Sequence, residues 1–362
     1  MKKIITGFLI LAIIFLSVTS CNAEGGFPFS NGNNDKTDTD NTASSSSTKK
    51  EDTDKNDAST QIYQRNENTV IFGSYPQSEV TNVSIKSKLN DMVGKAPTSM
   101  NPNGWSAFEY KDINAKNFIW YTDVEYNNEK YRAVYFTSYL SILPGYEQKE
   151  SNSNQDDNGY KINTVYWFKF EPISWTVIND NNSSGVLFLL SDLIIDAQQY
   201  HSDAKAKKVN GETVYANNYA ESKIRAWLND NFYNTAFDTK EKSIIRNTAI
   251  NNSAKSSGNS DNSFACADTT DKIFLLSYEE ANRVDVSIRK KSVTDYTRML
   301  GATAVLSAVS SSPQYGRGTW WLRSSFSEKT RARAIGYEGT PTLNKQVNIT
   351  DLGVVPALKI KT

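Results

Sequence analysis

The sequence predicts an α+β fold that is β-dominated, with its helices inserted mid-chain. Short apolar segments bounded by Gly, Pro, Asn or Asp occupy both ends of the folded region, which indicates strands. Apolar residues at helical spacing occur only between those two groups of strands. Elements grouped in this way are typical of an α+β architecture, whereas a regular alternation of strand and helix would indicate a parallel α/β sheet.

The first strands are predicted in residues 68–80 and 116–136. The first segment is an apolar run that meets a glycine and a Tyr-Pro turn. The second contains two aromatic-rich strands on either side of Asn127 and Asn128, residues that tolerate positive φ. We therefore expect residues 116–136 to form a β-hairpin.

Two later strands are predicted in residues 164–178 and 185–191, with a turn of Asn and Asp residues between them. Pro172 interrupts the first of these segments and indicates a bend or an edge, because proline cannot donate a hydrogen bond to a neighbouring strand. The chain closes with three further predicted strands, at residues 320–324, 331–339 and 353–360.

The helical signals lie in the middle of the chain. Residues 220–232 place apolar side chains on one stripe, which predicts an amphipathic helix with Trp227 in the core. The other apolar members of this stripe are Ile224, Leu228 and Phe232. Shorter helices are predicted behind the capping-box pairs Asp238/Glu241 and Ser277/Glu280 and in residues 293–302.

The N-terminal sixty residues predict export and a tether. Residues 1–20 combine a basic start, a short apolar run and small residues, as a secretory signal does. Cys21 follows directly and resembles the lipidated cysteine of a bacterial lipobox; an ordinary cleaved signal with an incidental cysteine is the alternative. Residues 21–60 are rich in Ser, Thr, Asn and Asp, and we expect them to be a disordered tether to a single large domain at 61–362.

Composition argues against several classes of function. The 40 basic and 40 acidic residues balance, so no net field favours a nucleic acid as partner. Beyond Cys21 the sequence holds a single cysteine, Cys266, and its single histidine is His201. These counts exclude a disulfide within the domain, a Cys-rich zinc site and a multi-histidine metal site. We expect Cys266 to be a packed thiol, and we expect neither a metal nor a cofactor.

The segment 318–325 (GTWWLRSS) contains the candidate ligand-binding residues. In a strand, Trp320 and Trp321 point to opposite faces, and Arg323 shares the face of Trp321. A guanidinium beside an indole can stack or can pair with a carboxylate. Two interpretations remain open: a core strand with an internal arginine salt bridge, or a ligand site that uses Trp321 and Arg323.

Catalytic motifs are missing from the sequence, so we expect the protein not to be an enzyme. It contains no Gly-rich phosphate loop, nucleophile elbow or zinc helix. A glycan hydrolase with two carboxylates would need neither Cys nor His, but spacing alone cannot select a pair among 40 acidic residues. Glu171 and the Asn-Asp run at 179–182 lack the spacing of a calcium loop, and we expect that run to be a turn.

Several phrases together resemble a family of bacterial secreted domains known as domain of unknown function 6273. The similarity covers most of 72–360, with its best-matching core at 165–362; the family's usual Arg before the last proline is Val355 here. The late tryptophans and the closing strand are also similar to C-type-lectin-like folds of the formylglycine-generating-enzyme type, but the cysteines of those enzymes are missing, so the resemblance implies only the architecture. The phrases that carry the family resemblance include FGSYPQ (72–77), AESKIRAWLNDNFYNTAF (220–237), WWLRSS (320–325) and GVVPALKI (353–360).

These observations predict a bacterial cell-envelope lipoprotein, lipid-anchored through Cys21 and surface-exposed, whose C-type-lectin-like domain binds a ligand without catalysis. The expected partners are the membrane, through the N-terminal lipid, and a glycan, a host protein or another envelope component. Two alternatives remain: a carboxylate-dependent secreted glycan hydrolase, and a structural envelope protein without a discrete ligand.

Overall fold

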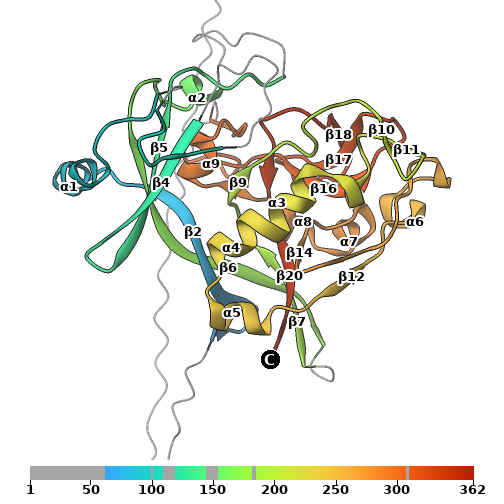
Figure 1. The fold of residues 1–362 in the computed structure, drawn as a ribbon. Coiled ribbons are helices and arrows are strands. Elements are labelled where there is room, and N and C mark those ends of the chain that lie inside the picture. Colours follow the sequence, from blue (N-terminus) through green and yellow to red (C-terminus); the bar gives the residue numbers. More distant parts are fainter. Residues whose placement is uncertain (1–61, 99–100, 109–118, 144–153, 182–184, 307–309) are drawn as a thin grey trace, which may run out of the picture. The chain divides into compact units, whose positions relative to one another are not determined.

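The computed structural model describes residues 62–98, 101–108, 119–143, 154–181, 185–306 and 310–362 (Figure 1). These residues belong to one compact unit, Ala58–Thr362. They form a mixed, β-rich α+β structure, as the sequence predicts. The expected signal segment, the candidate lipidation residue Cys21 and the expected tether lie outside the described residues.

The larger sheet is antiparallel and, within the described ranges, has nine strands. Its order is β14-β20-β7-β6-β5-β4-β3, and β2 pairs with β6 and β1 with β2. Neighbours in this sheet are often distant in sequence, since the last strand of the chain lies next to β7. The bounds are β1 (Gln64–Asn66), β2 (Thr69–Glu79), β3 (Ser106–Ala107), β4 (Ile119–Tyr126), β5 (Glu129–Phe136), β6 (Tyr166–Asn181), β7 (Val186–Ser191), β14 (Ile273–Phe274) and β20 (Ala357–Lys361).

The long strand β6 joins the two halves of this sheet. Its first residues pair with β5, up to Lys169, and its last residues pair with β7, from Trp175 onward. Pro172 lies in the gap between these two partners, where only β2 pairs with β6. A proline is tolerated there because no strand on that side needs its missing N–H. The prediction of a bend or edge at Pro172 therefore has a physical basis in the sheet.

The hairpin predicted in residues 116–136 is confirmed as β4 and β5. Asn127 and Asn128 form its turn with φ of 52° and 62°. Two successive residues with positive φ match the right-handed twist of the flanking strands, and Asn adopts this conformation more readily than most residues.

A second sheet contains the tryptophan strand. Its order is β18-β17-β16-β19-β9, so β16 is central and pairs with β17 on one side and with β19 on the other. The strands are β9 (Asp196–Ala197), β16 (Trp320–Ser325), β17 (Arg331–Ile335), β18 (Leu343–Gln346) and β19 (Gly353–Val354). Three two-stranded pairs complete the strands: β8 (Leu193–Ile194) with β15 (Ser292–Val293), β10 (Lys207–Val209) with β11 (Glu212–Val214), and β12 (Thr248–Ile250) with β13 (Thr269–Asp271).

The helices are short, and several begin as their sequences predict. The expectation of helices only in mid-chain is wrong for α1, which lies early in the chain between β2 and β3. Side chains of Asp238 and Ser277 cap α5 and α7, with Glu241 and Glu280 completing both capping boxes. The α-helices are α1 (Val83–Val93), α2 (Asn154–Asp157), α3 (Lys223–Trp227), α4 (Tyr233–Ala236), α5 (Thr239–Ile244), α6 (Ala254–Ser257), α7 (Tyr278–Arg283), α8 (Val286–Arg289) and α9 (Asp295–Met299). The 3-10 turns are η3 (Tyr219–Glu221) and η5 (Asn262–Phe264).

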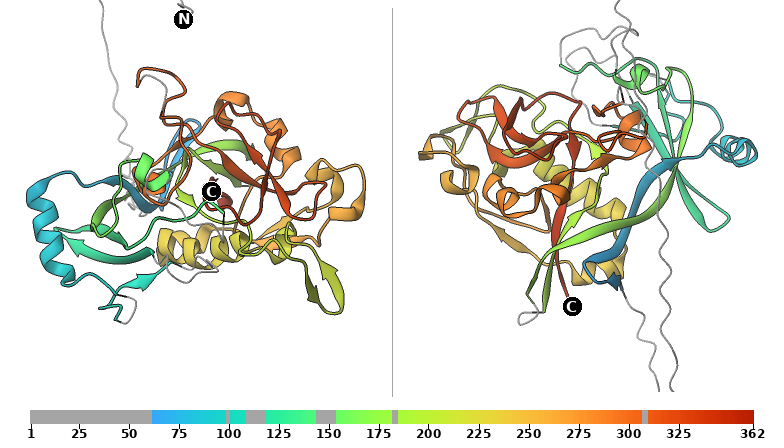
Figure 2. Two further views of the ribbon diagram at one scale, coloured as in Figure 1. Left: turned by 90° about the horizontal axis from the view of Figure 1, so that it is seen from above. Right: turned by 180° about the vertical axis from the view of Figure 1, so that it is seen from behind.

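The amphipathic segment predicted at 220–232 is helical but not a uniform α-helix. Between α3 and α4 lies a π-helical turn, η4 (Leu228–Phe232). In the left view of Figure 2 the yellow segment from α3 to α4 runs beside the teal hairpin strands. Gly73 permits the close approach of this segment to β2: its φ is +72°, and a Cβ there would lie 2.6 Å from the Phe237 ring.

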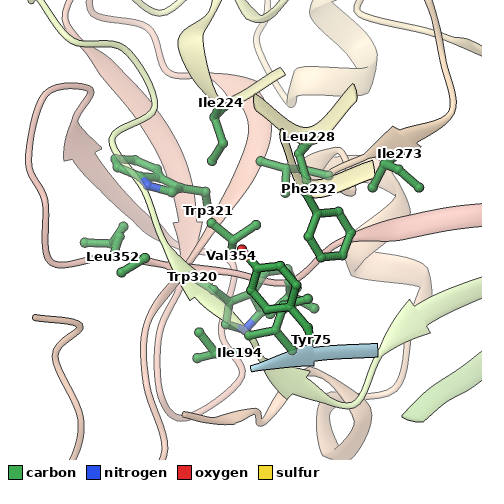
Figure 3. Packing of buried hydrophobic residues seen from close by; sticks show 14 of the residues in the cluster. Tyr75, Ile194, Ile224, Leu228, Phe232, Ile273, Trp320, Trp321, Leu352 and Val354 are labelled. Atoms are coloured by element: carbon green, nitrogen blue, oxygen red, sulfur yellow. The ribbon is translucent and has the colours of Figure 1, made fainter. Parts of the chain in front are cut away.

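One large hydrophobic cluster connects both sheets and the helical segment. Trp320 and Trp321 are fully buried within it. Figure 3 shows both rings among apolar side chains from other elements, including Ile194, Ile224, Leu352 and Val354. A smaller cluster packs α1 against the outer strands through Leu89, Trp120 and Trp167.

Candidate functional site: an aromatic pocket beside the helical segment

A pocket of about 340 Å³ lies between the hairpin sheet and the helical segment α3–η4–α4. Its volume falls in the range of small-molecule sites, roughly 300–1,000 Å³. The β-strand side contributes Tyr75, Ala107, Phe108, Tyr121 and Arg132, and Gln198 follows β9. The helical side contributes Lys223, Ala226, Trp227, Asp230, Asn231 and Thr235.

Three partly exposed aromatic rings line this pocket. Phe108 and Tyr121 form a pair with ring centroids 4.7 Å apart. Trp227 lies on the helical side and is held by stacking on the buried ring of Phe232, at 5.5 Å. Rings held in this way offer apolar faces to a ligand at little cost in conformational entropy.

Arg132 lines the pocket, but the protein already neutralises its charge. Its Nε and Nη2 donate to the two carboxylate oxygens of Asp123 at 2.7 and 2.9 Å, and its Nη1 donates to the Tyr296 hydroxyl at 3.2 Å. The guanidinium also lies 4.5 Å from the centroid of the Tyr121 ring. Because both sides of this guanidinium are occupied, Arg132 orients Tyr121 and does not offer an unpaired cation to a ligand.

Asp196 supports the pocket from behind. It is fully buried, and it accepts hydrogen bonds from the Tyr75 hydroxyl at 2.7 Å and from the Gln198 amide at 2.9 Å. Burial raises the pKa of Asp196 to about 6, although these two hydrogen bonds act in the opposite direction. Burial also raises the pKa of Tyr75 well above its usual range, so its hydroxyl remains a donor. Asp196 thus fixes two lining residues without itself lining the pocket.

The helical rim of the pocket is polar. Lys223 and Asp230 bring one positive and one negative charge, and Asn231 and Thr235 add an amide and a hydroxyl. Asp230 is the one carboxylate among the described lining residues, and it accepts a hydrogen bond from Asn234 at 2.9 Å. The rim therefore carries both donors and acceptors and no large net charge.

The structure places the two candidate ligand-binding residues inside the core. Trp321 is fully buried and donates its indole N–H to the Gln198 carbonyl at 2.8 Å. Arg323 is 3% exposed and pairs with Glu280 at 2.5 Å. A ligand at the surface does not reach either side chain. Of the two interpretations of the segment 318–325, these contacts support the core strand with an internal salt bridge.

Trp227 packs against the large hydrophobic cluster, but it is only partly buried and also lines the pocket. At helical spacing it lies at the edge of the stripe formed by the fully buried residues Ile224, Leu228 and Phe232. Phe108 and Tyr121 carry no sequence signal of their own, because only the fold brings β3 and β4 to this helix.

Three further features bear on function: the Cys266 thiol, possible metal-binding groups and possible membrane-spanning helices. Burial raises the pKa of the Cys266 thiol, which is the opposite of what a nucleophile needs. In the described part of the chain, no group of three or more His, Cys, Asp or Glu side chains is arranged to hold a metal ion. Among the helices of the described ranges, none is both long enough and apolar enough to span a bilayer.

A family model matches the second half of the chain. No curated protein and no solved structure matches the sequence. The match begins just before β7 and includes the whole second sheet, whereas Tyr75, Phe108, Tyr121 and Arg132 precede it. The pocket therefore combines matched and unmatched parts of the chain. Residues 184–362 match the family described as Domain of unknown function (DUF6273).

Proposed function

We propose that this chain is a cell-envelope lipoprotein whose domain binds a neutral glycan in the aromatic pocket without catalysis. The observation that carries the proposal is the combination of three partly exposed rings, Phe108, Tyr121 and Trp227, with a polar rim of low net charge. A sugar ring has apolar C–H faces and a hydroxyl edge, so it complements aromatic walls and an amide-and-carboxylate rim. We also propose that the domain has a C-type-lectin-like architecture.

The carboxylates around the pocket favour binding over hydrolysis. A glycosidase needs two carboxyl groups, one on each side of the bond that breaks. Asp230 is the single carboxylate in the described lining, Asp196 is enclosed behind Tyr75 and Gln198, and Asp123 is engaged by Arg132. Among the described residues, a sugar in the pocket would therefore contact one carboxylate, that of Asp230. A single carboxylate can accept hydrogen bonds from sugar hydroxyls in a binding site.

The test is calorimetric titration of the full-length protein with three neutral trisaccharides: cellotriose, maltotriose and tri-N-acetylchitotriose. We expect at least one to bind and to be recovered intact after prolonged incubation. Tyr121→Ala should weaken that binding about tenfold, or about 1.4 kcal/mol. Tyr126→Ala removes a tyrosine from the same strand but outside the pocket, and should leave the affinity unchanged. Cleaved trisaccharide would instead support the hydrolase alternative.

The envelope part of the proposal has its own test. Intact-mass analysis of the mature protein from its native host should show a diacylated Cys21 as the first residue. Cys21→Ala should release the protein from the membrane fraction, because acyl chains bind a bilayer through buried CH₂ groups. An unmodified residue other than Cys21 at the mature N-terminus would remove the anchor but leave the pocket proposal standing.

A further inference from the structure

A second hollow of about 420 Å³ lies where β6, β7 and β20 meet the segment before β12. It shares no lining residue with the aromatic pocket. Its lining is made of Asn179, Val186, Phe188, Arg246, Asn247, Thr248, Ala249 and Lys359. The two charged residues in this lining, Arg246 and Lys359, are both basic.

Strand register brings four of these residues into one row. Asn179 is paired directly with Phe188, and Phe188 is paired directly with Lys359. The carbonyl of Lys359 accepts the backbone N–H of Arg246 at 2.8 Å, which places Arg246 at the next position of the row. Residues paired directly across adjacent strands project from the same face of a sheet. The row is therefore fixed by backbone pairing and not by loop conformation.

The two cations of the row are not neutralised by neighbouring acids. Within the described part of the chain, the Arg246 guanidinium makes no ion pair or side-chain hydrogen bond. The Lys359 ammonium lies over the Phe188 ring, 5.2 Å from its centroid. Lys361, which is paired with Val186, adds a third cation two residues further along the same strand face.

The charge of Lys359 acts on the carboxylate of Glu280, but the ion-pair partner of Glu280 is Arg323. Burial acts to raise the pKa of Glu280, while the charge and hydrogen bond of Arg323 and, to a smaller extent, the charge of Lys359 hold it below its usual range. Its ion pair is with Arg323, at 2.5 Å. Lys359 therefore keeps its hydrogen-bond donors for another acceptor.

We propose that this hollow binds a phosphate group, either as a free ion or as a phosphomonoester. Arg246 can present two parallel N–H donors to two phosphate oxygens, and Lys359 can place a point charge beside a third. The amides of Asn179 and Asn247 supply neutral donors at the edge of the same hollow. A phosphate has enough oxygens and charge for both cations, whereas a carboxylate has only two oxygens.

The test measures binding of three probes to the full-length protein by calorimetry at low ionic strength. Inorganic phosphate represents the free ion, glycerol 3-phosphate a small monoester, and dihexanoyl-phosphatidic acid a soluble lipid with a monoester headgroup. The double variant R246Q/K359Q should raise the dissociation constant of the bound probe about tenfold, since each charge-assisted hydrogen bond is stronger than a neutral one. The double variant K88Q/K255Q removes two exposed lysines elsewhere and should change the constant less than about twofold.

The probe that binds tightest identifies the source of the phosphate. The proposal is overturned if none of the three probes binds, or if both double variants weaken binding equally, because the effect would then be one of net charge. Equal thermal unfolding midpoints for the two variants and the parent protein show that the comparison concerns binding and not folding. Trisaccharide affinity serves as a second control and should be unchanged in R246Q/K359Q.

Discussion

The tryptophan strand β16 and the aromatic pocket contain the same kinds of residue in opposite settings. In β16, Trp321 lies near Arg323, whose charge is neutralised by Glu280. In the pocket, Tyr121 lies against Arg132, whose charge is neutralised by Asp123. Both regions pair an aromatic ring with an arginine that is bound to a carboxylate, yet Trp321 and Arg323 are buried, whereas Tyr121 and Arg132 line the pocket.

The difference between the two regions comes from what covers each face. β16 has β17 on one side and β19 on the other, and every residue of the strand is buried. Tyr121 lies on β4, near the edge of the larger sheet, where only the short strand β3 continues it. An aromatic-arginine combination therefore does not by itself indicate a ligand site. A ligand site also requires uncovered surface beside the pair, as Tyr121 and Arg132 have in the pocket.

Replacing Trp321 by Ala should give the largest loss of stability. The ring is fully buried, so its removal leaves a cavity in the core, at a cost of about 3–5 kcal/mol in the free energy of unfolding. Urea denaturation measures this loss. Trp321→Phe keeps most of the ring volume and should cost less. A loss below about 1 kcal/mol for Trp321→Ala would mean that β16 is not the core strand described above.

Replacing Glu280 by Gln should cost about 3 kcal/mol, because it leaves the buried Arg323 guanidinium without its counter-charge. Glu279→Gln on the same helix breaks only an exposed pair with Arg283 and should cost less than about 1 kcal/mol. The pKa of Glu280 is lowered in the folded state, so its contribution is present above the pKa of the unfolded chain and is lost as pH falls through the folded pKa. Equal losses for both variants would contradict the buried pair.

Asp196 should give stability the opposite dependence on pH. Its folded pKa is raised to about 6, so between about pH 4 and 6 the unfolded chain has released a proton that the folded protein keeps. The free energy of unfolding should fall by about 2–3 kcal/mol as pH rises through this window. Asp196→Asn has no proton to release, so a series of urea titrations should show this fall in the parent protein and not in the variant. Identical pH profiles of stability in the parent protein and Asp196→Asn would contradict a raised pKa for the Asp196 carboxyl.

Tyr121→Ala should cost less stability than the changes at Trp321, Glu280 and Asp196, about 1 kcal/mol, because the residue is partly exposed in the folded protein. Its effect on trisaccharide affinity should be larger than its effect on folding. The ratio of the affinity change to the stability change distinguishes a pocket residue from a residue of β16. In β16, any loss of binding should result from loss of folding. Comparing urea midpoints with calorimetric affinities for the same variants gives this ratio.

Local features of the fold could be predicted from sequence because their causes are local. Asn127 and Asn128 predict the hairpin turn through their tolerance of positive φ, and Asp238 with Glu241 predicts the start of α5. In both cases the residues that make the contacts are neighbours in the chain. The β-rich α+β class follows from the same kind of information.

The pocket could not be predicted because its parts are distant in sequence. Tyr75, Tyr121 and Trp227 meet only after β2, β4 and the helical segment have packed together. The helical stripe predicts the contact of Trp227 with the core, but not the pocket on the other side of that residue. The segment 318–325 led to a ligand-binding hypothesis because the sequence shows which residues share a face of a strand. It does not show which other side chains cover that face.

The most direct test of the glycan-binding pocket compares one tryptophan from each region. Trisaccharide affinity is measured by calorimetry for Trp227→Ala, which alters the pocket, and for Trp320→Phe, which alters the core strand at a residue hydrogen-bonded to Arg289 and not to the pocket lining. We predict that Trp227→Ala weakens binding about tenfold or more and that Trp320→Phe leaves the affinity unchanged while lowering stability. Unchanged affinity in Trp227→Ala, or a larger loss in Trp320→Phe, would contradict the assignment of binding to the aromatic pocket.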